Sequence, residues 1–357
     1  MKLMFSTICF LLFYSLSGQF AHEPVHEGQE GELLKNLVID SYRPNVVLSY
    51  GQARDTMYGI IDNVQDTVAG IYSDHKVYLQ PGEDPSTYIF KDGTPNGINA
   101  EHSYPQSKGA GNGNPRSDMH HLFPSRVGTN SARGSLPFSE ISDNITDTWF
   151  YKTQENSNKP SASLIDRYSE KGNSRWEPRE TVKGDIARAI MYFFTMYEAQ
   201  AMNADPTFFE GMRETLCMWH ELDPVDEKEW NRTKMIAKWQ EGKANPFVLD
   251  CTLAGRMYCD GPSMVCLIVD SPTIPLESVR LIENPVRVHA TFEGFVEEKI
   301  YSYEVLNIYG QRLMSGTIPN NTNSIQLDLD FLQSGAYIVH WILPKEGTSK
   351  SFMILKI

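Results

Sequence analysis

The sequence predicts an α+β domain followed by a small all-β module. Apolar residues recur at helical spacing between residues 184 and 241, whereas residues 73–175 are rich in Gly, Pro, Asn and Ser. After residue 279 the apolar pattern changes to period two, as in strands. These changes divide the chain into a signal peptide over 1–21, a first domain over 22–268, a linker over 269–278 and a C-terminal domain over 279–357.

The first residues have the composition of a secretory signal peptide. Lys2 precedes an apolar run through Leu16, and small residues follow up to Ala21. This run is too short to span a bilayer stably, and no other stretch of the sequence approaches the length of a transmembrane helix. We therefore expect an exported protein with no stable membrane insertion.

Four cysteines remain once the signal peptide is removed: Cys217, Cys251, Cys259 and Cys266. None of their spacings is the CxxC of many zinc sites, so we expect disulfides in an exported chain. The sequence leaves all three pairings open.

Three helices and a set of strands account for the apolar patterns. The helices are expected over residues 184–197, around the apolar residues from Phe208 to Trp219, and over 227–241. In the C-terminal domain, apolar residues alternate with polar ones at Ile325, Leu327 and Leu329 and again at Tyr337, Val339 and Trp341. We expect all of these side chains to pack in a core.

The densest group of chemically capable residues lies between Glu101 and Gly134. A strand ending near His102, a Gly-rich loop, a second strand that Pro124 ends and a short helix over VGTNSARG would form a ββα unit. A neutral imidazole suits the deprotonation of water, and a carboxylate with an amide oxygen suits Mg²⁺. An arginine can hold a phosphate. Together these groups indicate phosphodiester hydrolysis.

The pair Glu101-His102, the run SDMHHLFP over residues 117–124, and Asn130 with Arg133 resemble the bacterial endonuclease I family of His-metal finger (ββα-metal) nucleases. The resemblance extends over roughly residues 40–260 and includes VKGDIARAIMYFF and NPFV. It implies that His102 is the general base and that Glu101 and Asn130 hold Mg²⁺, with Mn²⁺ or Ca²⁺ as alternatives. It also implies cleavage of DNA and RNA with little sequence specificity, leaving 5′-phosphates.

Other residues receive supporting roles. Arg133, Arg116 and Arg188 are the candidates for substrate binding, with an intradomain ion pair as the alternative for Arg133. Relatives place a phosphate-contacting arginine in this loop, and no residue of the compact Gly/Asn loop aligns with it. Arg116 is the candidate to replace it. We expect Asp118, His120 and His121 to support the site from behind, with the two adjacent histidines on opposite faces of a strand.

The C-terminal domain resembles the sorting domain of the type IX secretion system, through its ENPV start, its VLNIYGQRL hairpin, the run LDLDFLQSGAYIVHW and its FMILKI end. The resemblance implies an immunoglobulin-like sandwich, recognition by the type IX machinery, and a secreted or surface-bound protein. The alternative is a domain that binds carbohydrate or a surface.

Several readings compete with a nuclease. The net charge of −13 argues against binding of nucleic acid through an extended basic surface, but not against an enzyme with a small basic cleft. HEPVH at 22–26 matches the HExxH zinc-protease pattern, but Pro24 opposes the helix that this pattern needs, and we expect little order so near the cleavage site. The main alternative is a non-enzymatic binding protein that keeps the finger as a structural metal site. We expect a monomer.

Overall fold

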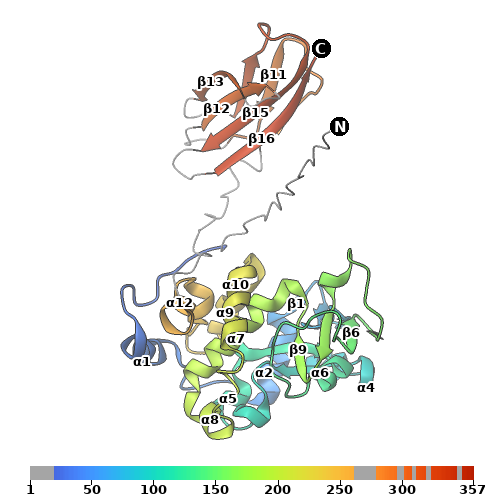
Figure 1. The fold of residues 1–357 in the computed structure, drawn as a ribbon, viewed down its shortest axis with the longest axis vertical. Helices are drawn as coiled ribbons and strands as arrows, with labels where there is room; N and C mark the ends of the chain where they lie inside the picture. Colours follow the sequence, from blue (N-terminus) through green and yellow to red (C-terminus); the bar gives the residue numbers. More distant parts are fainter. Residues whose placement is uncertain (1–19, 261–278, 296–300, 308–310, 319–322, 344–347) are drawn as a thin grey trace, which may run out of the picture. The chain divides into compact units, whose positions relative to one another are not determined.

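The computed structural model describes residues 20–260, 279–295, 301–307, 311–318, 323–343 and 348–357 (Figure 1). The chain divides into two compact units, Met1–Ile268 and Val269–Ile357. Residues 1–19 of the expected signal peptide, the whole expected linker and Cys266 lie outside the described residues. No described helix is long and apolar enough to cross a membrane.

The first unit mixes short strands with helices, as the sequence predicts. Its described helices are α1 (Gly31–Tyr42), α2 (Tyr50–Thr56), α3 (Pro85–Ile89), α4 (Gly93–Asn96), α5 (Asn114–Ser117), α6 (Val127–Arg133), α7 (Lys183–Met196), α8 (Glu198–Ala204), α9 (Arg213–Leu222), α10 (Glu227–Ala237), α11 (Pro246–Leu249) and α12 (Leu253–Met257). Its described strands are β1 (Asn63–Val64), β2 (Thr67–Ala69), β3 (Lys76–Tyr78), β4 (Ile98–His102), β5 (Leu122–Arg126), β6 (Thr148–Tyr151), β7 (Gln154–Asn156), β8 (Ser169–Gly172) and β9 (Arg175–Glu177).

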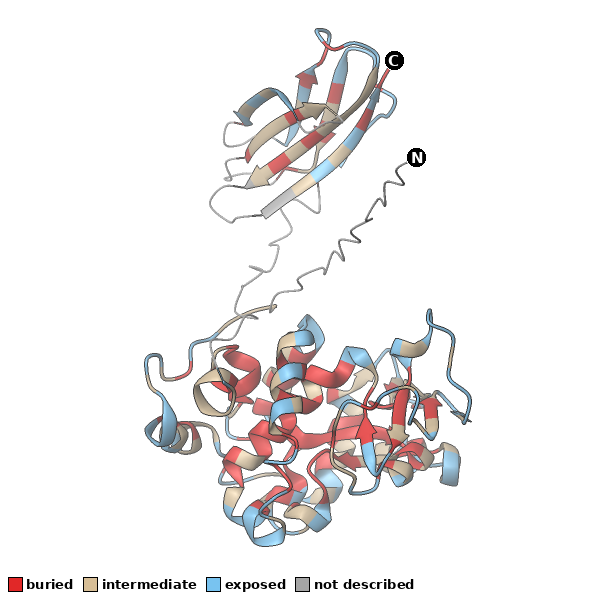
Figure 2. Ribbon diagram, in the orientation of Figure 1, coloured by how far each residue is buried: buried red, intermediate tan, exposed pale blue. Residues whose placement is uncertain are grey.

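Helix α7 forms the centre of this unit. Nearly all of its residues are buried, including Ile186, Ile190 and Phe193, and Figure 2 shows it as a red element among other helices. The expected helix over 184–197 is therefore confirmed. The second begins only at Arg213, so Phe208 and Met212 pack into the core from the segment before it. The third ends at Ala237 instead of residue 241.

Strands β4 and β5 pair antiparallel and lead into α6, which gives the predicted ββα order. Two details differ from the prediction. His120 and His121 lie in a 3-10 turn over Met119–His121, not in a strand, because the Asp118 side chain accepts a hydrogen bond from the His120 N–H and caps this turn. Pro124 lies inside β5 instead of ending it.

The position of Pro124 has a simple explanation. Its carbonyl accepts a hydrogen bond from the Ile71 N–H and so points away from β4. The proline nitrogen points the same way, because the two groups of one residue lie on the same side of an antiparallel strand. The missing N–H therefore removes no hydrogen bond between β4 and β5.

The cysteines form disulfides, as expected. Cys217 in α9 is bonded to Cys259, just after α12, with 5.6 Å between their Cα atoms. Cys251 is also disulfide-bonded. The Cys217–Cys259 bond links α9 to the segment that follows α12.

The described residues of the second unit are all strand or loop. The strands are β10 (Arg280–Leu281), β11 (His289–Glu293), β12 (Tyr301–Asn307), β13 (Arg312–Ile318), β14 (Ser324–Asp328), β15 (Gly335–Leu343) and β16 (Thr348–Lys356). They form two antiparallel sheets, in the orders β10-β11-β14 and β13-β12-β15-β16. Phe292 of the first sheet contacts Trp341 of the second, and both are fully buried. The period-two pattern of the sequence therefore marks a core, as predicted.

Candidate active site

The ββα unit and α2 enclose a hollow of about 570 Å³ in the first unit. Glu101 and His102 reach it from the end of β4, and Asn130 reaches it from α6. The structure therefore brings together the predicted base and both predicted metal ligands. The lining consists of Tyr50, Arg54, Asn99, Ala100, Glu101, His102, Pro105, Gln106, Ser107, Asn130, Ser131, Gly134 and Ser135.

His102 is held in one orientation by its backbone surroundings. Its Nε2–H donates to the carbonyl oxygen of Arg116 at 2.9 Å, so Nδ1 carries the lone pair of the neutral ring. The amide nitrogen of Gln106 lies 3.3 Å from this Nδ1. Burial, followed by the charge of the neighbouring His121, lowers the pKa of His102 to about 3. The ring is therefore a neutral proton acceptor at physiological pH.

Glu101 uses only one of its carboxylate oxygens within the protein. Its Oε1 accepts hydrogen bonds from the Tyr72 hydroxyl at 2.7 Å and from Arg133 at 2.9 Å. Its Oε2 has no hydrogen-bond partner within the described part of the chain. Burial raises the pKa of Glu101, although Arg133 and Tyr72 both act to lower it.

Asn130 is oriented in a similar way. Its amide nitrogen donates to the side-chain oxygen of Asn99 at 2.8 Å and to the carbonyl of Ala100 at 3.2 Å. Its side-chain oxygen accepts nothing from the described residues and is free to bind a ligand. A free carboxylate oxygen and a free amide oxygen on one hollow are hard ligands that suit a divalent cation such as Mg²⁺. The donor set therefore fits the predicted metal.

Comparisons with known proteins identify the family of this chain. A protein-family comparison matches residues 31–251 to endonuclease I, which is more than half of the chain. The chain belongs to the endonuclease I family. Residues 284–355 match the secretion system C-terminal sorting domain. This endonuclease is therefore a nuclease of a metal-dependent family that carries the type IX sorting domain of secreted or surface proteins, which excludes the non-enzymatic alternative.

Two curated relatives are extracellular ribonucleases. The one from Bacillus subtilis (strain 168) is 26% identical over 234 residues, covering 62% of this chain and 73% of the relative. The one from Bacillus amyloliquefaciens is 29% identical over 236 residues, covering 62% and 72%. Among solved structures, PorZ, a surface component of the type IX secretion system of Porphyromonas gingivalis, aligns over 24% of this chain and 12% of its own, at 21% identity and a TM-score of 0.20.

In this endonuclease Arg133 is a buried anchor. It is fully buried, pairs with Glu101, and also donates to the carbonyls of His102 at 3.0 Å and Ser103 at 2.7 Å. The prediction that Arg133 binds substrate is therefore wrong, and the intradomain ion pair is correct. Its function is to fix the end of β4, and with it the two residues that face the hollow.

Arg188 is also inaccessible to substrate. It lies fully buried on α7, where Nε and Nη2 form two bonds with the carboxylate of Glu229 at 2.8 and 2.6 Å. The expected substrate contact is wrong, because the fork of this guanidinium is already occupied inside the core. Arg116 differs from both. Its side chain is exposed, and its carbonyl positions His102, although it does not line the hollow.

Asp118 lies behind the site and connects three parts of the chain. One of its oxygens accepts from the His120 N–H at 3.0 Å and from Gln240 at 2.9 Å. The other accepts from the hydroxyls of Tyr192 at 2.8 Å and Tyr197 at 2.7 Å. With both oxygens occupied twice, Asp118 has no free position for a metal.

His120 and His121, which follow Asp118 in the chain, are both buried. The Nε2–H of His120 donates to the carbonyl of Lys243 at 2.9 Å, and that of His121 donates to the carbonyl of Pro115 at 2.6 Å. The His121 ring lies 5.5 Å from the ring of His102. Burial lowers the pKa of both, to about 4 for His121, so both stay neutral behind the base.

Residues of the site that are absent from the sequence prediction include Tyr50, Arg54, Tyr72, Asn99 and Gln106. Tyr50 and Arg54 stand four residues apart on α2, a spacing that places both on one helix face and could have indicated a joint role. Nothing in the sequence links Tyr72 to Glu101, because that contact depends on the fold.

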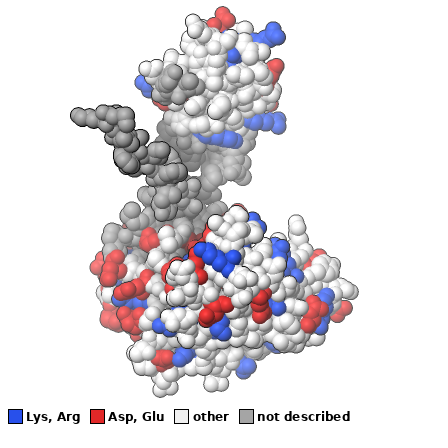
Figure 3. Space-filling view, turned by 45° about the vertical axis from the view of Figure 1, so that its right-hand side comes forward, with Lys and Arg blue, Asp and Glu red and all other residues white. Residues whose placement is uncertain are grey.

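Charge on the protein surface is mixed. On the face drawn in Figure 3, acidic and basic side chains lie among one another and form no continuous basic surface. The net charge of −13 adds no overall attraction for a polyanionic substrate, and this face offers it no extended basic surface.

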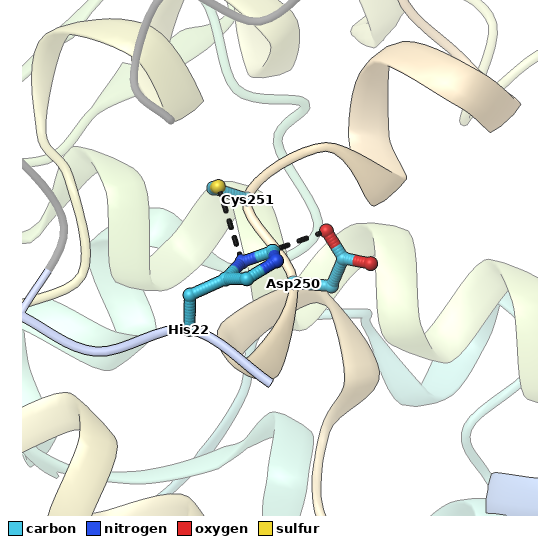
Figure 4. A group of neighbouring side chains, drawn as sticks. All are labelled: His22, Asp250 and Cys251. Carbon is cyan, nitrogen blue, oxygen red and sulfur yellow. Dashed lines mark hydrogen bonds and ion pairs between the residues drawn. The ribbon is translucent and has the colours of Figure 1, made fainter. Parts of the chain in front are cut away.

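A second group of possible metal ligands lies elsewhere, at His22, Asp250 and Cys251 (Figure 4). Cys251 is disulfide-bonded and so offers no thiolate. Asp250 already accepts hydrogen bonds from the Val25 N–H at 2.8 Å and from Arg256 at 2.6 Å. The group is a structural contact that orders residues 22–26, contrary to the disorder expected there. These residues are not helical, as Pro24 predicts, so HEPVH forms no zinc site.

Proposed function

We propose that this endonuclease is a His-metal finger enzyme that hydrolyses DNA and RNA with little sequence specificity and leaves 5′-phosphates. One observation supports this above the others. The Nδ1 acceptor of His102 and the free oxygens of Glu101 and Asn130 line one hollow. Backbone carbonyls orient His102 and Asn130, and the side chains of Tyr72 and Arg133 hold Glu101. That arrangement suits a base and a metal acting on the same phosphate.

In the proposed reaction Nδ1 of His102 accepts a proton from a water molecule that attacks the phosphorus atom. The bond from phosphorus to the 3′ oxygen breaks and the phosphate stays on the 5′ side. The 3′ oxygen leaves with the bonding electron pair and takes a proton from solvent water to become a hydroxyl, and His102 later returns its proton to solvent. The Arg116 carbonyl keeps the ring oriented, and the attacking water takes the place at Nδ1 that the Gln106 amide N–H, which donates there at 3.3 Å, holds in the structure. Glu101 and Asn130 hold the cation, Mg²⁺ by preference. When bound, this cation supplies positive charge to the phosphate and to the leaving oxygen.

The lining offers one guanidinium, one carboxylate, amides and hydroxyls on an open hollow, which suits contact with the strand backbone more than readout of bases. We propose that the second unit is an immunoglobulin-like sandwich that directs export by the type IX machinery after a signal peptide is removed. The enzyme is proposed to act as a monomer with Mg²⁺, and Mn²⁺ or Ca²⁺ are alternatives.

The test is digestion of supercoiled plasmid and of total RNA by the full mature chain, with Mg²⁺, with EDTA, and with His102→Ala. We expect both polymers to be cut with Mg²⁺ and neither with EDTA, and activity to fall by at least ~10²-fold in the variant. His75→Ala is the matched control, since the His75 Nε2–H also donates to a backbone carbonyl, at 2.7 Å, but outside the hollow. Equal loss in both histidine variants would contradict the assignment of the base.

The chemistry of the ends is tested separately. Products with 5′-phosphates accept a labelled phosphate from a kinase only after treatment with phosphatase. Labelling without phosphatase would show 5′-hydroxyl ends and would refute the proposed direction of cleavage. Folded protein that cuts neither polymer with Mg²⁺, Mn²⁺ or Ca²⁺ would refute the proposed activity as a whole.

A further inference from the structure

One cation lines the hollow, and it comes from outside the ββα unit. Arg54 lies in the last turn of α2, one turn after Tyr50, and both side chains reach the lining. The guanidinium carbon of Arg54 lies 5.0 Å from the centre of the Tyr50 ring, and that ring lies 5.6 Å from the His102 ring. Stacking on a tyrosine next to the base fixes the charge of Arg54 at the hollow.

The bonding of Arg54 differs from that of the other arginines packed into the first unit. Most of those arginines are neutralised by carboxylates, in the pairs Arg126–Glu155, Arg133–Glu101, Arg188–Glu229, Arg232–Asp62 and Arg256–Asp250. Arg179 has no carboxylate partner among the described residues, but its Nε donates to the Ile71 carbonyl and its Nη1 to the Thr181 hydroxyl. Arg54 has no carboxylate partner among the described residues, and its Nε is buried without any hydrogen-bond acceptor. A buried charged donor without an acceptor is costly, so such a group indicates a ligand that supplies the acceptor.

The composition of the lining restricts this ligand to an anion. Arg54 is the only Lys or Arg in the described lining, which otherwise holds the carboxylate of Glu101 and neutral groups. Arg116 adds a second unpaired guanidinium just outside it, 4.6 Å from the same Tyr50 ring. Two guanidiniums on one aromatic ring, both without a carboxylate among the described residues, form a local positive site on an acidic protein.

We propose that Arg54 is a substrate-binding residue that holds a phosphate group of the polymer strand beside the one that is cleaved. Tyr50 positions its guanidinium, and Arg116 extends the positive site outward. The inference rests on the proposed function, because it assumes that a phosphodiester strand crosses this hollow. The free donors of the Arg54 fork form charge-assisted hydrogen bonds with phosphate oxygens.

The test measures binding apart from cleavage. Full-length His102→Ala protein in EDTA is titrated with fluorescein-labelled single-stranded and duplex oligonucleotides at several NaCl concentrations. Adding Arg54→Gln is expected to raise Kd roughly tenfold and to reduce the slope of log Kd against log salt concentration by about 0.7–0.9, the value for one lost phosphate contact. In the active protein the same change raises KM by a similar factor. Arg175→Gln is the control, because Arg175 is exposed on β9, far from the lining residues in sequence, and bonds only the Ser174 carbonyl.

The outcomes separate the inference from the proposed function. Unchanged Kd, KM and salt slope in folded Arg54→Gln protein would overturn the inference alone. A failure of the His102→Ala protein to bind either oligonucleotide, with no cleavage by the wild type, would overturn both. If Arg54→Gln does not fold, Arg54→Lys is measured in its place, because it keeps the charge and loses the two-donor fork. A higher Kd with an unchanged salt slope then supports the inference, and a wild-type Kd refutes it.

Discussion

Tyr72→Phe removes one hydroxyl group from the buried contacts of Glu101. Tyr72 is fully buried, and its hydroxyl donates to Oε1 of Glu101 at 2.7 Å, alongside Arg133 at 2.9 Å. Without it, Oε1 keeps a single donor. A hydrogen bond to a charged group contributes about 1.5–3 kcal/mol, so we expect the free energy of unfolding to fall by roughly 2 kcal/mol.

The same hydroxyl also orients the proposed metal ligand. Loss of a group that positions a ligand typically weakens metal affinity by about 10–100-fold. We therefore expect the Mg²⁺ concentration for half-maximal cleavage to rise at least ~10-fold in Tyr72→Phe. The rate at saturating Mg²⁺ should change little, because His102 keeps its contacts with Arg116 and Gln106.

Tyr104→Phe provides the matched control. Tyr104 is equally buried and stacks on Phe193 with ring centres 4.2 Å apart, but its hydroxyl has no hydrogen-bond partner in the structure. Urea denaturation should show a change within about 0.5 kcal/mol for Tyr104→Phe, since no hydrogen bond is lost. Equal losses of stability in the two variants, or an unchanged Mg²⁺ midpoint in Tyr72→Phe, would show that Tyr72 does not position Glu101.

Three further predictions concern the rest of the first unit. Arg188→Met leaves the Glu229 carboxylate buried and unpaired and should cost about 3–5 kcal/mol by urea denaturation, while Kd for an oligonucleotide stays unchanged in the folded fraction. Replacing both Cys217 and Cys259 by Ser opens a loop with a sequence separation of 42 and should cost about 4 kcal/mol under non-reducing conditions, with no loss if the bond is not formed. Burial raises the pKa of Glu170 from 4.5 to about 8, so its protonated form stabilises the fold below pH 4.5, and this contribution is lost as the pH rises toward 8. The melting temperature should therefore decline over this pH range, and Glu170→Gln should make the decline smaller. The same pH profile of melting temperature in both proteins would contradict the raised pKa.

The spacing of apolar residues and the positions of turn residues correctly predicted elements that depend on short stretches of sequence. The apolar spacing from Ile186 to Phe193 marked α7, and the turn residues around Gly109 separated the two strands of the ββα unit. His102, Glu101 and Asn130 could be found because they lie within one short segment whose order matches a known family. Their convergence on one hollow then follows from the pairing of β4 with β5 and the packing of α6.

The errors have a common origin in contacts between distant parts of the chain. The sequence around Arg188 does not show whether the guanidinium binds a substrate or a carboxylate of the protein. Its partner is Glu229, which lies 41 residues away in the sequence. The Asp118 cap turned two histidines out of the expected strand, although Asp is a common capping residue and could have indicated this. Arg54 and Tyr72 lie outside the segment from Glu101 to Gly134, so only the fold reveals that Arg54 lines the hollow and that Tyr72 contacts Glu101.

The contacts around Asp250 have a practical consequence for protein engineering. The N–H groups of Glu23 and Val25 donate to the Leu249 carbonyl and the Asp250 carboxylate, each at 2.8 Å, and Arg256 donates to the carbonyls of Val25, His26 and Gln29. Residues 23–29 and 249–256, near the two ends of the described part of the nuclease unit, are therefore joined by hydrogen bonds. A unit with adjoining ends can be inserted into a surface loop of a host protein, or re-cut to begin at a new position, without stretching either partner.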